Sequence, residues 1–332
     1  MTTMGDVARL AGVSASTVSH VLNGTRNVDR GTRLRVEAAI EKTGYRRNVV
    51  ARSLAAGRTH TVGLSISALT NPYFGNLVHA VERALSDAGY VLVVGDSHDD
   101  VDSEKRLTDS LLDRKVDGMI VAPAAGSERV TLPMIARTRT PLVLIDRAVD
   151  DGHDQVGPEN FESARSLTRH LLDLGHRRIG AVRGLAGISS TVERFDGYRA
   201  AFADHGVAVD PALVLDGRSS TDVAETQVRE LLSRADRPSA LVSLNNSMTI
   251  GALKAVRGLG MSIPGDIAFV CFDDFEWSDL FEPRLTAAAQ DVDAIGSTAV
   301  ELLLRRIRGS DEPPQRIRVP TTLHHRNSCG CT

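Results

Sequence analysis

The chain has 332 residues, 42% of them hydrophobic and 24% charged, and a formal net charge of −3 at pH 7. It is long enough for two or three domains, and no apolar run reaches the roughly 18 residues of a membrane span. There is no signal-peptide pattern at the start, and an odd number of cysteines, three, argues against a disulfide framework, so we expect a protein of the reducing cytoplasm without membrane contact.

The charge is unevenly distributed. Residues 1–60 contain ten Lys or Arg against four Asp or Glu, a balance of +6, and the remaining residues therefore carry −9. Basic charge gathered at one end of an otherwise acidic chain indicates a module that binds a polyanion, with a basic solvated surface as the alternative.

The N-terminal residues predict short helices separated by tight turns. Thr3 can cap a helix through Leu10, with Asp6 as its reciprocal capping partner, and Gly12 ends that helix. Ser14 then caps a second helix that stops at 23–24.

The third predicted helix begins after Asp29 and ends at Gly44. Its expected apolar stripe consists of Leu34, Val36, Ala39 and Ile40. Two helices joined by a glycine turn, followed by a supporting helix, are typical of a helix-turn-helix module.

The second helix carries small hydroxyl, amide and imidazole side chains that suit a major groove about 12 Å wide. We expect Ser14 and Thr17 to hold phosphates, Ala15 and the Thr17 methyl to meet a thymine methyl, and His20 to donate to guanine. Ser16 and Asn23 complete the predicted contact set. The alternative is a capped surface helix without a ligand.

From residue 61 onwards, short apolar runs such as "TVGLSIS", "YVLVVGDS" and "DGMIVAP" alternate with amphipathic helical segments. The rhythm restarts after residue 160 with segments such as "RRIGAVRG", "ALVSLN" and "IAFVCFDD". This alternation predicts an α/β fold with two doubly wound parallel-sheet lobes behind the all-α head. We expect one lobe to span about 61–160 and 291–319, and the other about 161–290 and 320–332.

Polar residues follow the predicted strands. Ligands of doubly wound sheets lie beyond the carboxyl ends of the strands, so these side chains are candidates for a cleft site, although each alone could be a solvated loop residue. They are Asp96, Asp146, Arg147, Arg183, Asp216, Arg218, Asn245, Asn246, Asp273 and Asp274.

The segments "GDVARLAGVSASTVSHVLNGTRNV", "NPYFGNLVHAVERAL", "RFDGYRAAF" and "FDDFEWSDLFEPRLTAAAQD" closely resemble, in the same order, the lactose-repressor (LacI/GalR) family of bacterial regulators. The resemblance covers the chain and implies a helix-turn-helix head at 1–46, a hinge helix and linker at 47–60, and a periplasmic-binding-protein-like core at 61–332. It implies that 48–56 becomes a helix on operator DNA and that Leu54 wedges into the central base step. Asn48, Ala55 and Arg26 join the expected DNA contacts, and His20 and Arg26 match purine-repressor-like members.

The resemblance also implies effector-binding residues, each carried over at its matching position. They are Tyr73, Phe74, Asp146, Arg147, Ser190, Arg194, Asn245, Asp273 and Gln290. Arg218 stands where sugar-binding members often place an aromatic residue, and with Arg183 it favours an acidic or phosphorylated ligand.

The resemblance thus implies a bacterial transcriptional repressor that is located at the nucleoid and acts as a homodimer. It implies binding to double-stranded operator DNA with a pseudo-palindromic sequence, under the control of a small-molecule effector. A corepressor-dependent regulator of purine-repressor type and a solute-binding sensor without a DNA role are the alternatives. We expect no enzyme activity and no cofactor, since the chain has no P-loop, G-x-S-x-G or G-x-G-x-x-G motif. We also expect no metal site, because the spacing of His324, His325, Cys329 and Cys331 matches no common zinc pattern.

Overall fold

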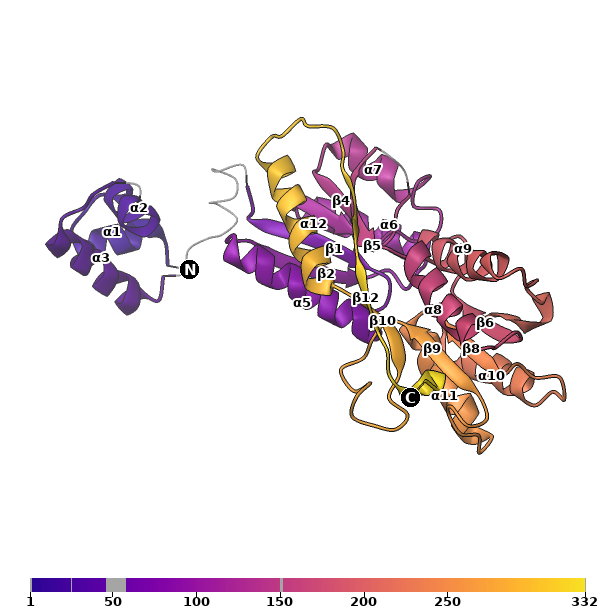
Figure 1. The fold of residues 1–332 in the computed structure, drawn as a ribbon. Helices are drawn as coiled ribbons and strands as arrows, with labels where there is room; N and C mark the ends of the chain where they lie inside the picture. The colour runs from indigo at the N-terminus through magenta and orange to yellow at the C-terminus, as the bar shows by residue number, and fades with distance from the viewer. Residues whose placement is uncertain (1, 25, 46–57, 150–151, 332) are drawn as a thin grey trace. The chain divides into compact units, whose positions relative to one another are not determined.

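The computed structural model describes residues 2–24, 26–45, 58–149 and 152–331. Contacts divide the chain into two compact units, Met1–Thr59 and His60–Thr332, each of which is described separately (Figure 1).

The first unit is built from the helices α1 (Met4–Ala11), α2 (Ala15–Asn23) and α3 (Arg30–Thr43). Their predicted starts are confirmed. The Thr3 hydroxyl accepts from the Asp6 N–H, and the Asp6 carboxylate accepts from the Thr3 N–H at 2.9 Å, which forms a capping box. Gly12 takes the left-handed conformation, φ 65°, that turns the chain from α1 into α2.

A small apolar core holds these helices together. It consists of Val7, Ala8, Ala11, Val18, Val36 and Ala39. The prediction that Leu34 belongs to this stripe is wrong, because its side chain is 56% exposed. Leu34 lies two residues before Val36, about 200° around the helix, and therefore on the opposite face.

The second unit contains two six-stranded sheets. The first has the order β11-β5-β4-β3-β1-β2, with all its strands parallel. Its strands are β1 (Thr61–Ile66), β2 (Val91–Asp96), β3 (Gly118–Val121), β4 (Leu142–Ile145), β5 (Asp154–Pro158) and β11 (Arg316–Val319). We call this sheet and its helices the N-lobe; the helices are α5 (Pro72–Asp87), α6 (Val101–Asp113), α7 (Thr131–Thr138) and α12 (Val292–Ile307).

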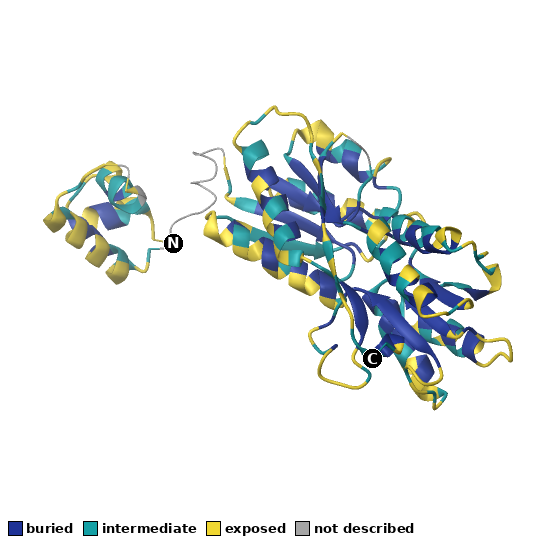
Figure 2. Ribbon diagram, viewed as in Figure 1, coloured by how far each residue is buried: buried dark blue, intermediate teal, exposed yellow. Residues whose placement is uncertain are grey.

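Alternating side chains of the N-lobe strands enter two different cores. On β4, Val143 and Ile145 pack with α5 and α12, which lie side by side, while Leu142 and Leu144 pack on the opposite face with α6 and α7 (Figure 1). Because helices cover both faces of the sheet, strands such as β3 and β4 are buried along their length, as Figure 2 shows. This explains why they are continuous apolar runs in the sequence.

The second sheet has the order β12-β10-β9-β8-β6-β7, and β12 is its only described antiparallel strand. Its strands are β6 (Ile179–Arg183), β7 (Val214–Asp216), β8 (Ala240–Ser243), β9 (Ala268–Phe272), β10 (Thr286–Gln290) and β12 (Thr321–His324). We call this sheet the C-lobe, together with α8 (Phe161–Asp173), α9 (Ser189–Asp204), α10 (Thr221–Leu232), α11 (Asn246–Gly258) and the 3-10 turns η1 (Pro211–Leu213) and η2 (Asn327–Cys329).

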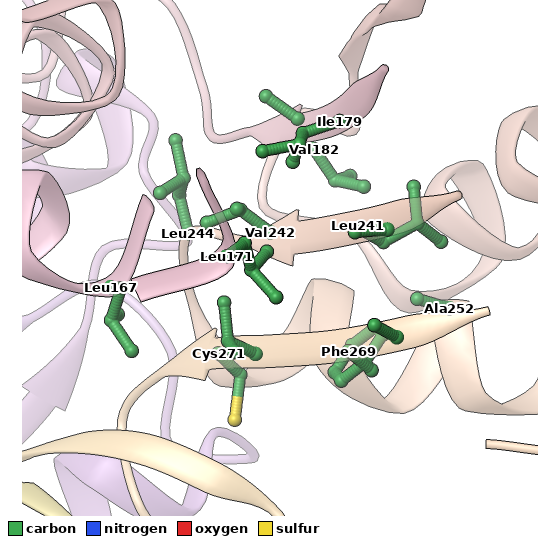
Figure 3. Close-up of a cluster of buried hydrophobic side chains, with 14 of the residues drawn as sticks. Leu167, Leu171, Ile179, Val182, Leu241, Val242, Leu244, Ala252, Phe269 and Cys271 are labelled. Carbon is green, nitrogen blue, oxygen red and sulfur yellow. The ribbon is translucent and has the colours of Figure 1, made fainter. Parts of the chain in front are cut away.

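The C-lobe core gathers between the strands and their covering helices. The core includes Leu167 and Leu171 of α8, Leu241 of β8, and Phe269 and Cys271 of β9 (Figure 3). The fold class predicted from the sequence is therefore confirmed.

The chain passes between the lobes at β5 to α8, at β10 to α12, and at Pro320 between β11 and β12. Strand β5 was not predicted, because it begins with the polar pair Asp154 and Gln155. Asp154 is buried and accepts from the Arg306 guanidinium of α12 at 2.7 Å, which compensates its charge. Among the described residues, no helix has the length and hydropathy to cross a membrane.

Candidate functional site

The N-terminus of α2 carries a cluster of hydroxyl groups. The Ser14 hydroxyl accepts from the Thr17 N–H at 3.1 Å and lies 2.8 Å from Ser16 Oγ and 2.9 Å from Thr17 Oγ1. The positive end of the helix dipole and these donors together favour an anion such as a phosphate.

One face of α2 packs against the core of the head, and the opposite face lies at the surface. Val18 is fully buried in the core of the head, while Ala15 and Ser16 are exposed and Thr17 and His20 are half-buried. The helix thus presents small polar side chains from a rigid support, which is the arrangement that reading of base edges requires. Arg26, beyond the end of α2, is exposed.

Part of the predicted DNA-contact set lies outside the described residues. This applies to Asn48, Leu54 and Ala55 of the expected hinge helix and to the side chain of Asn23. Their roles stay predictions.

A polar cavity of about 60 Å³ lies between the N-lobe and the C-lobe. It is lined by nine of the ten residues predicted to bind an effector: Tyr73, Phe74, Asp146, Arg147, Ser190, Arg194, Asn245, Asp273 and Gln290. Strands and loops more than 200 positions apart in the sequence therefore converge on one small space.

On the N-lobe side, Arg147 is buried among acceptors. Its guanidinium donates to Asp99 at 2.5 Å and to Ser67 Oγ at 2.9 Å, and its Nε lies 3.4 Å from Asp146 Oδ2. Although burial opposes the charged form, Asp99 and Asp146 raise the pKa of Arg147, so it stays a cation in the cleft.

Tyr73 joins this group from the first turn of α5. Its hydroxyl donates to Asp146 Oδ1 at 2.8 Å. Burial, together with the Asp146 charge, raises the pKa of Tyr73 well above its ordinary value, so the phenol stays protonated and holds the carboxylate in place.

On the C-lobe side, Asp273 accepts from the Gln290 side-chain amide and from the Asn246 N–H, the latter at 3.1 Å. Burial raises the pKa of Asp273 although Arg194 and Gln290 oppose this shift. Arg194 donates to Leu244 O at 2.9 Å, and its guanidinium stacks 3.7 Å from the Phe272 ring.

Two buried polar atoms of cavity-lining residues have no hydrogen-bond partner among the described residues: Arg147 Nε and Gln290 Oε1. Buried polar groups are normally satisfied, so such atoms mark places where a bound molecule can donate or accept. The cavity offers a donor on one lobe and an acceptor on the other, which suits a ligand with several hydroxyl groups.

Two arginines that favoured an acidic ligand lie elsewhere. Arg218 is exposed and does not line the cavity, although its neighbour Ser219 does. Arg183 lies over the Phe195 ring at 5.6 Å and does not line it either.

The sequence reasoning missed cavity residues that precede or follow the obvious strand ends. Asp99, Ser67 and Asn71 line the cavity, and Asn160 fixes Arg194 by accepting from its Nε at 2.8 Å. Asp99 lies in the polar turn "DSHDD" at the end of β2 and has φ 56°. The unusual composition of this turn is the sequence signal that could have identified Asp99 as a cavity residue.

Comparison with known families matches both units. Residues 3–48 match the family described as "Bacterial regulatory proteins, lacI family", and residues 168–329 match "Periplasmic binding protein-like domain".

Individual relatives match along the whole chain. The ribose operon repressor of Escherichia coli strain K12 is 34% identical over 329 residues, 99% of this chain and 100% of that protein. The HTH-type transcriptional repressor PurR of Aliivibrio salmonicida is 34% identical over 309 residues, 93% of each chain. The solved lac repressor dimer, bound to operator and the anti-inducer ONPF, has a TM-score of 0.88 at 27% identity over 99% of each chain.

Proposed function

The chain belongs to the LacI family of bacterial regulatory proteins and is a DNA-binding transcriptional repressor of that family, and we propose here which of its residues perform this function. The repressor binds a pseudo-palindromic operator as a homodimer, and a small metabolite held between the lobes changes its affinity. The observation that carries the ligand assignment is the pair of buried carboxylates, Asp146 and Asp273, that reach one cavity from opposite lobes.

In the DNA-bound state, α2 lies in the major groove. Ser14 and Thr17 contact phosphates, His20 donates to a guanine, and Ala15 and Ser16 lie against base edges. The hydroxyl cluster at the start of α2, with its exposed small neighbours, supports this assignment. Arg26 contacts the DNA backbone next to the bases that α2 contacts.

Between the two half-sites, Leu54 from each protomer enters the central base step, flanked by Asn48 and Ala55. Unstacking one step takes a few kcal/mol, which the additional contacts of the bent DNA offset. This proposal rests on the position of Leu54 in the sequence.

The ligand is a neutral, hydroxyl-rich metabolite such as a sugar. Asp146 and Asp273 accept from hydroxyls. Gln290 Oε1 supplies an acceptor and Arg147 Nε, which is 3.4 Å from Asp146 Oδ2, supplies a donor, and neither atom makes a hydrogen bond to a described residue. An acidic or phosphorylated ligand has less support, because Arg183 and Arg218 do not line the cavity. A space of about 60 Å³ admits only a few waters, so the lobes or the lining side chains must move apart to admit a sugar.

The homodimer uses an exposed apolar surface of the C-lobe. Leu280 is 72% and Phe281 67% exposed, on the loop between β9 and β10. Adjacent large apolar side chains with this exposure mark an association surface. The dimer places its two recognition helices one helical turn apart on the operator, in the bacterial cytoplasm at the nucleoid.

A ligand panel tests the cavity assignment. The purified protein is heated with neutral sugars and polyols, with the corresponding sugar acids and with sugar phosphates, and the melting temperature is recorded. We expect a neutral member to raise it most, since a ligand that binds only the folded state stabilises that state. A response confined to the acids or phosphates would contradict the neutral-ligand assignment and leave the DNA assignment untouched.

A further inference from the structure

Three potential metal ligands converge at the C-terminal end of the described chain. One ligand atom each from His170, Cys329 and Cys331 lies within 4.8 Å of the other two. Cys331 Sγ is 3.7 Å from His170 Nε2 and 2.6 Å from Cys329 Sγ. Both cysteines have free thiols.

The fold brings these residues together from distant parts of the C-lobe. His170 lies in the last turn of α8, and Cys329 ends η2. Gly330, in the left-handed conformation with φ 82°, reverses the backbone between the two cysteines. As a result both thiols donate to one carbonyl, that of Arg326, at 3.2 and 3.4 Å.

The cysteine-bearing segment is held firmly before any ion binds. The Ser328 hydroxyl donates to Phe269 O at 2.7 Å, and the Thr286 N–H donates to the Ser328 hydroxyl at 2.8 Å. Arg326 pairs with Asp274 at 2.7 Å. A site on so fixed a support needs little ordering when it binds an ion.

The spacing along the chain could not reveal this cluster. Cys329 and Cys331 are separated by one residue, which alone matches no common zinc pattern, and His170 lies 161 positions before Cys331. The structure therefore changes the expectation that the C-terminal cysteines form no metal site.

We propose that His170, Cys329 and Cys331 bind a thiophilic divalent ion, of which Zn²⁺ is the natural example. Two thiolates and an imidazole are the donors that zinc prefers, and hard cations such as Mg²⁺ require oxygen ligands instead. The fourth position is taken by His325, whose ring centroid is 4.7 Å from that of His170, or by a water molecule.

Binding requires two local changes. The thiols release their protons and give up their hydrogen bonds to Arg326 O. The sulfurs separate from 2.6 Å to about 3.8 Å, the distance across a tetrahedral ion with bonds of about 2.3 Å. The ion then joins the C-terminal segment to α8 and stabilises the C-lobe, independently of DNA.

Cobalt titration of the full-length, untagged protein tests this proposal, because Co²⁺ is a coloured substitute for Zn²⁺. Reduced, chelator-treated protein is titrated with Co²⁺ and then with Zn²⁺. We expect one ion per chain, a thiolate-to-cobalt absorption band that Zn²⁺ abolishes, and a higher melting temperature with Zn²⁺.

Matched variants identify the ligands. Cys331→Ser and His170→Gln should each weaken Co²⁺ binding at least tenfold and remove the band or reduce it strongly. His324→Gln, an exposed neighbour of His325, and Cys271→Ala, a thiol in the buried core, should retain both.

Three results would overturn the proposal. One is the absence of stoichiometric binding by reduced wild-type protein. Another is binding that persists in both Cys331→Ser and His170→Gln. The third is a Cys329–Cys331 disulfide in the purified protein, detected by mass spectrometry, with no ion uptake after reduction. Because His170 is on a half-buried helix surface, His170→Gln keeps the test valid if the cysteine variant does not fold.

Discussion

Asp146 and Asp273 occupy equivalent positions in the two lobes. Asp146 directly follows β4 and Asp273 directly follows β9, and each of these strands is third from the same end of its sheet. Both residues have left-handed backbone, with φ 67° and 74°, and both side chains are buried in the cavity wall. Aspartate is one of the few residues other than glycine that adopt this conformation readily, so one residue type meets the backbone and the ligand requirement together.

This symmetry explains how a ligand can control the relation between the lobes. A molecule that hydrogen-bonds to both carboxylates interacts best with one separation of the lobes and therefore favours that conformation. Coupling of this kind typically amounts to about 1–3 kcal/mol, enough to change operator occupancy near its threshold.

Replacing either carboxylate should separate ligand response from DNA binding. We expect Asp146→Asn and Asp273→Asn to weaken binding of the panel's best ligand more than tenfold, since each loses a charge-assisted acceptor. Calorimetry with ligand and anisotropy with operator measure the two properties. Asp113→Asn, at an exposed position of α6, is the control. Loss of operator affinity in the absence of ligand would contradict this division of roles.

The raised pKa of Asp273 predicts a pH-dependent difference in stability. Burial raises this pKa, so the folded protein favours the protonated carboxyl group. The resulting contribution to folding stability is present at low pH and is lost as the pH rises through the pKa of Asp273 in the folded protein. The Asp273→Asn variant carries no ionisable group at this position. Its melting temperature should therefore rise relative to that of the wild type as the pH increases from about 4 to about 7. Melting curves of both proteins at these pH values measure the gain. A difference that is constant or shrinks with pH would show that the ionised carboxylate is not destabilising.

Much of the fold follows from local sequence signals. The caps at Thr3, Ser14 and Asp29 were predicted and are present, because capping depends on side chains only three residues away. Strands such as β4 were predictable from apolar runs, whereas β5 was not, because Asp154 is compensated by Arg306, 152 positions later.

The residues at the strand ends that line the candidate cleft were predictable, but the hydrogen bonds between their side chains were not. The bond between Arg147 and Asp99, the bond between Arg194 and Asn160, and the exclusion of Arg218 all depend on how loops pack in three dimensions. The hinge helix predicted at residues 48–56 stays a prediction based on family resemblance.

Two substitutions in the head should affect DNA binding in different ways. His20→Ala should weaken specific binding by about 1–3 kcal/mol and relax preference at one base pair, because it removes a base-edge donor. Arg26→Ala should weaken binding to all sequences and lower the slope of log K against log salt by about 1. Anisotropy over a salt series distinguishes them, with Arg257→Ala in the core unit as control. Equal loss of slope in both variants would contradict the base-contact role of His20.

The exposed pair Leu280 and Phe281 should govern dimerisation. Leu280→Asp or Phe281→Asp places a charge in an apolar interface, and we expect the dimer dissociation constant to rise at least tenfold. Sedimentation equilibrium measures it. Leu174→Asp, which alters a side chain 41% exposed elsewhere on the C-lobe, should leave it unchanged. A dimer insensitive to both changes would place the interface on another surface.

Buried Glu104 should be a main determinant of N-lobe stability. Its carboxylate accepts from the Ala124 N–H at 2.7 Å, from the Thr131 hydroxyl at 2.5 Å and from the Ser127 hydroxyl. Glu104→Ala leaves these donors unmatched and should lower the free energy of unfolding by about 3 kcal/mol, while Glu104→Gln, which keeps an acceptor, should lower it by about 1 kcal/mol. Urea unfolding followed by circular dichroism measures both. Equal losses would contradict this account, because Gln retains the side-chain volume and an acceptor oxygen that Ala removes.

The most direct test of the repressor function is selection from a library of random DNA duplexes by the purified full-length protein, with and without the best ligand of the panel. The account predicts an enriched pseudo-palindrome whose half-sites lose definition with His20→Ala and whose recovery changes when ligand is added. Recovery of unenriched DNA, or an enriched site unaffected by His20→Ala, Ser16→Ala and Thr17→Ala, would contradict the assignment of α2 as the recognition helix.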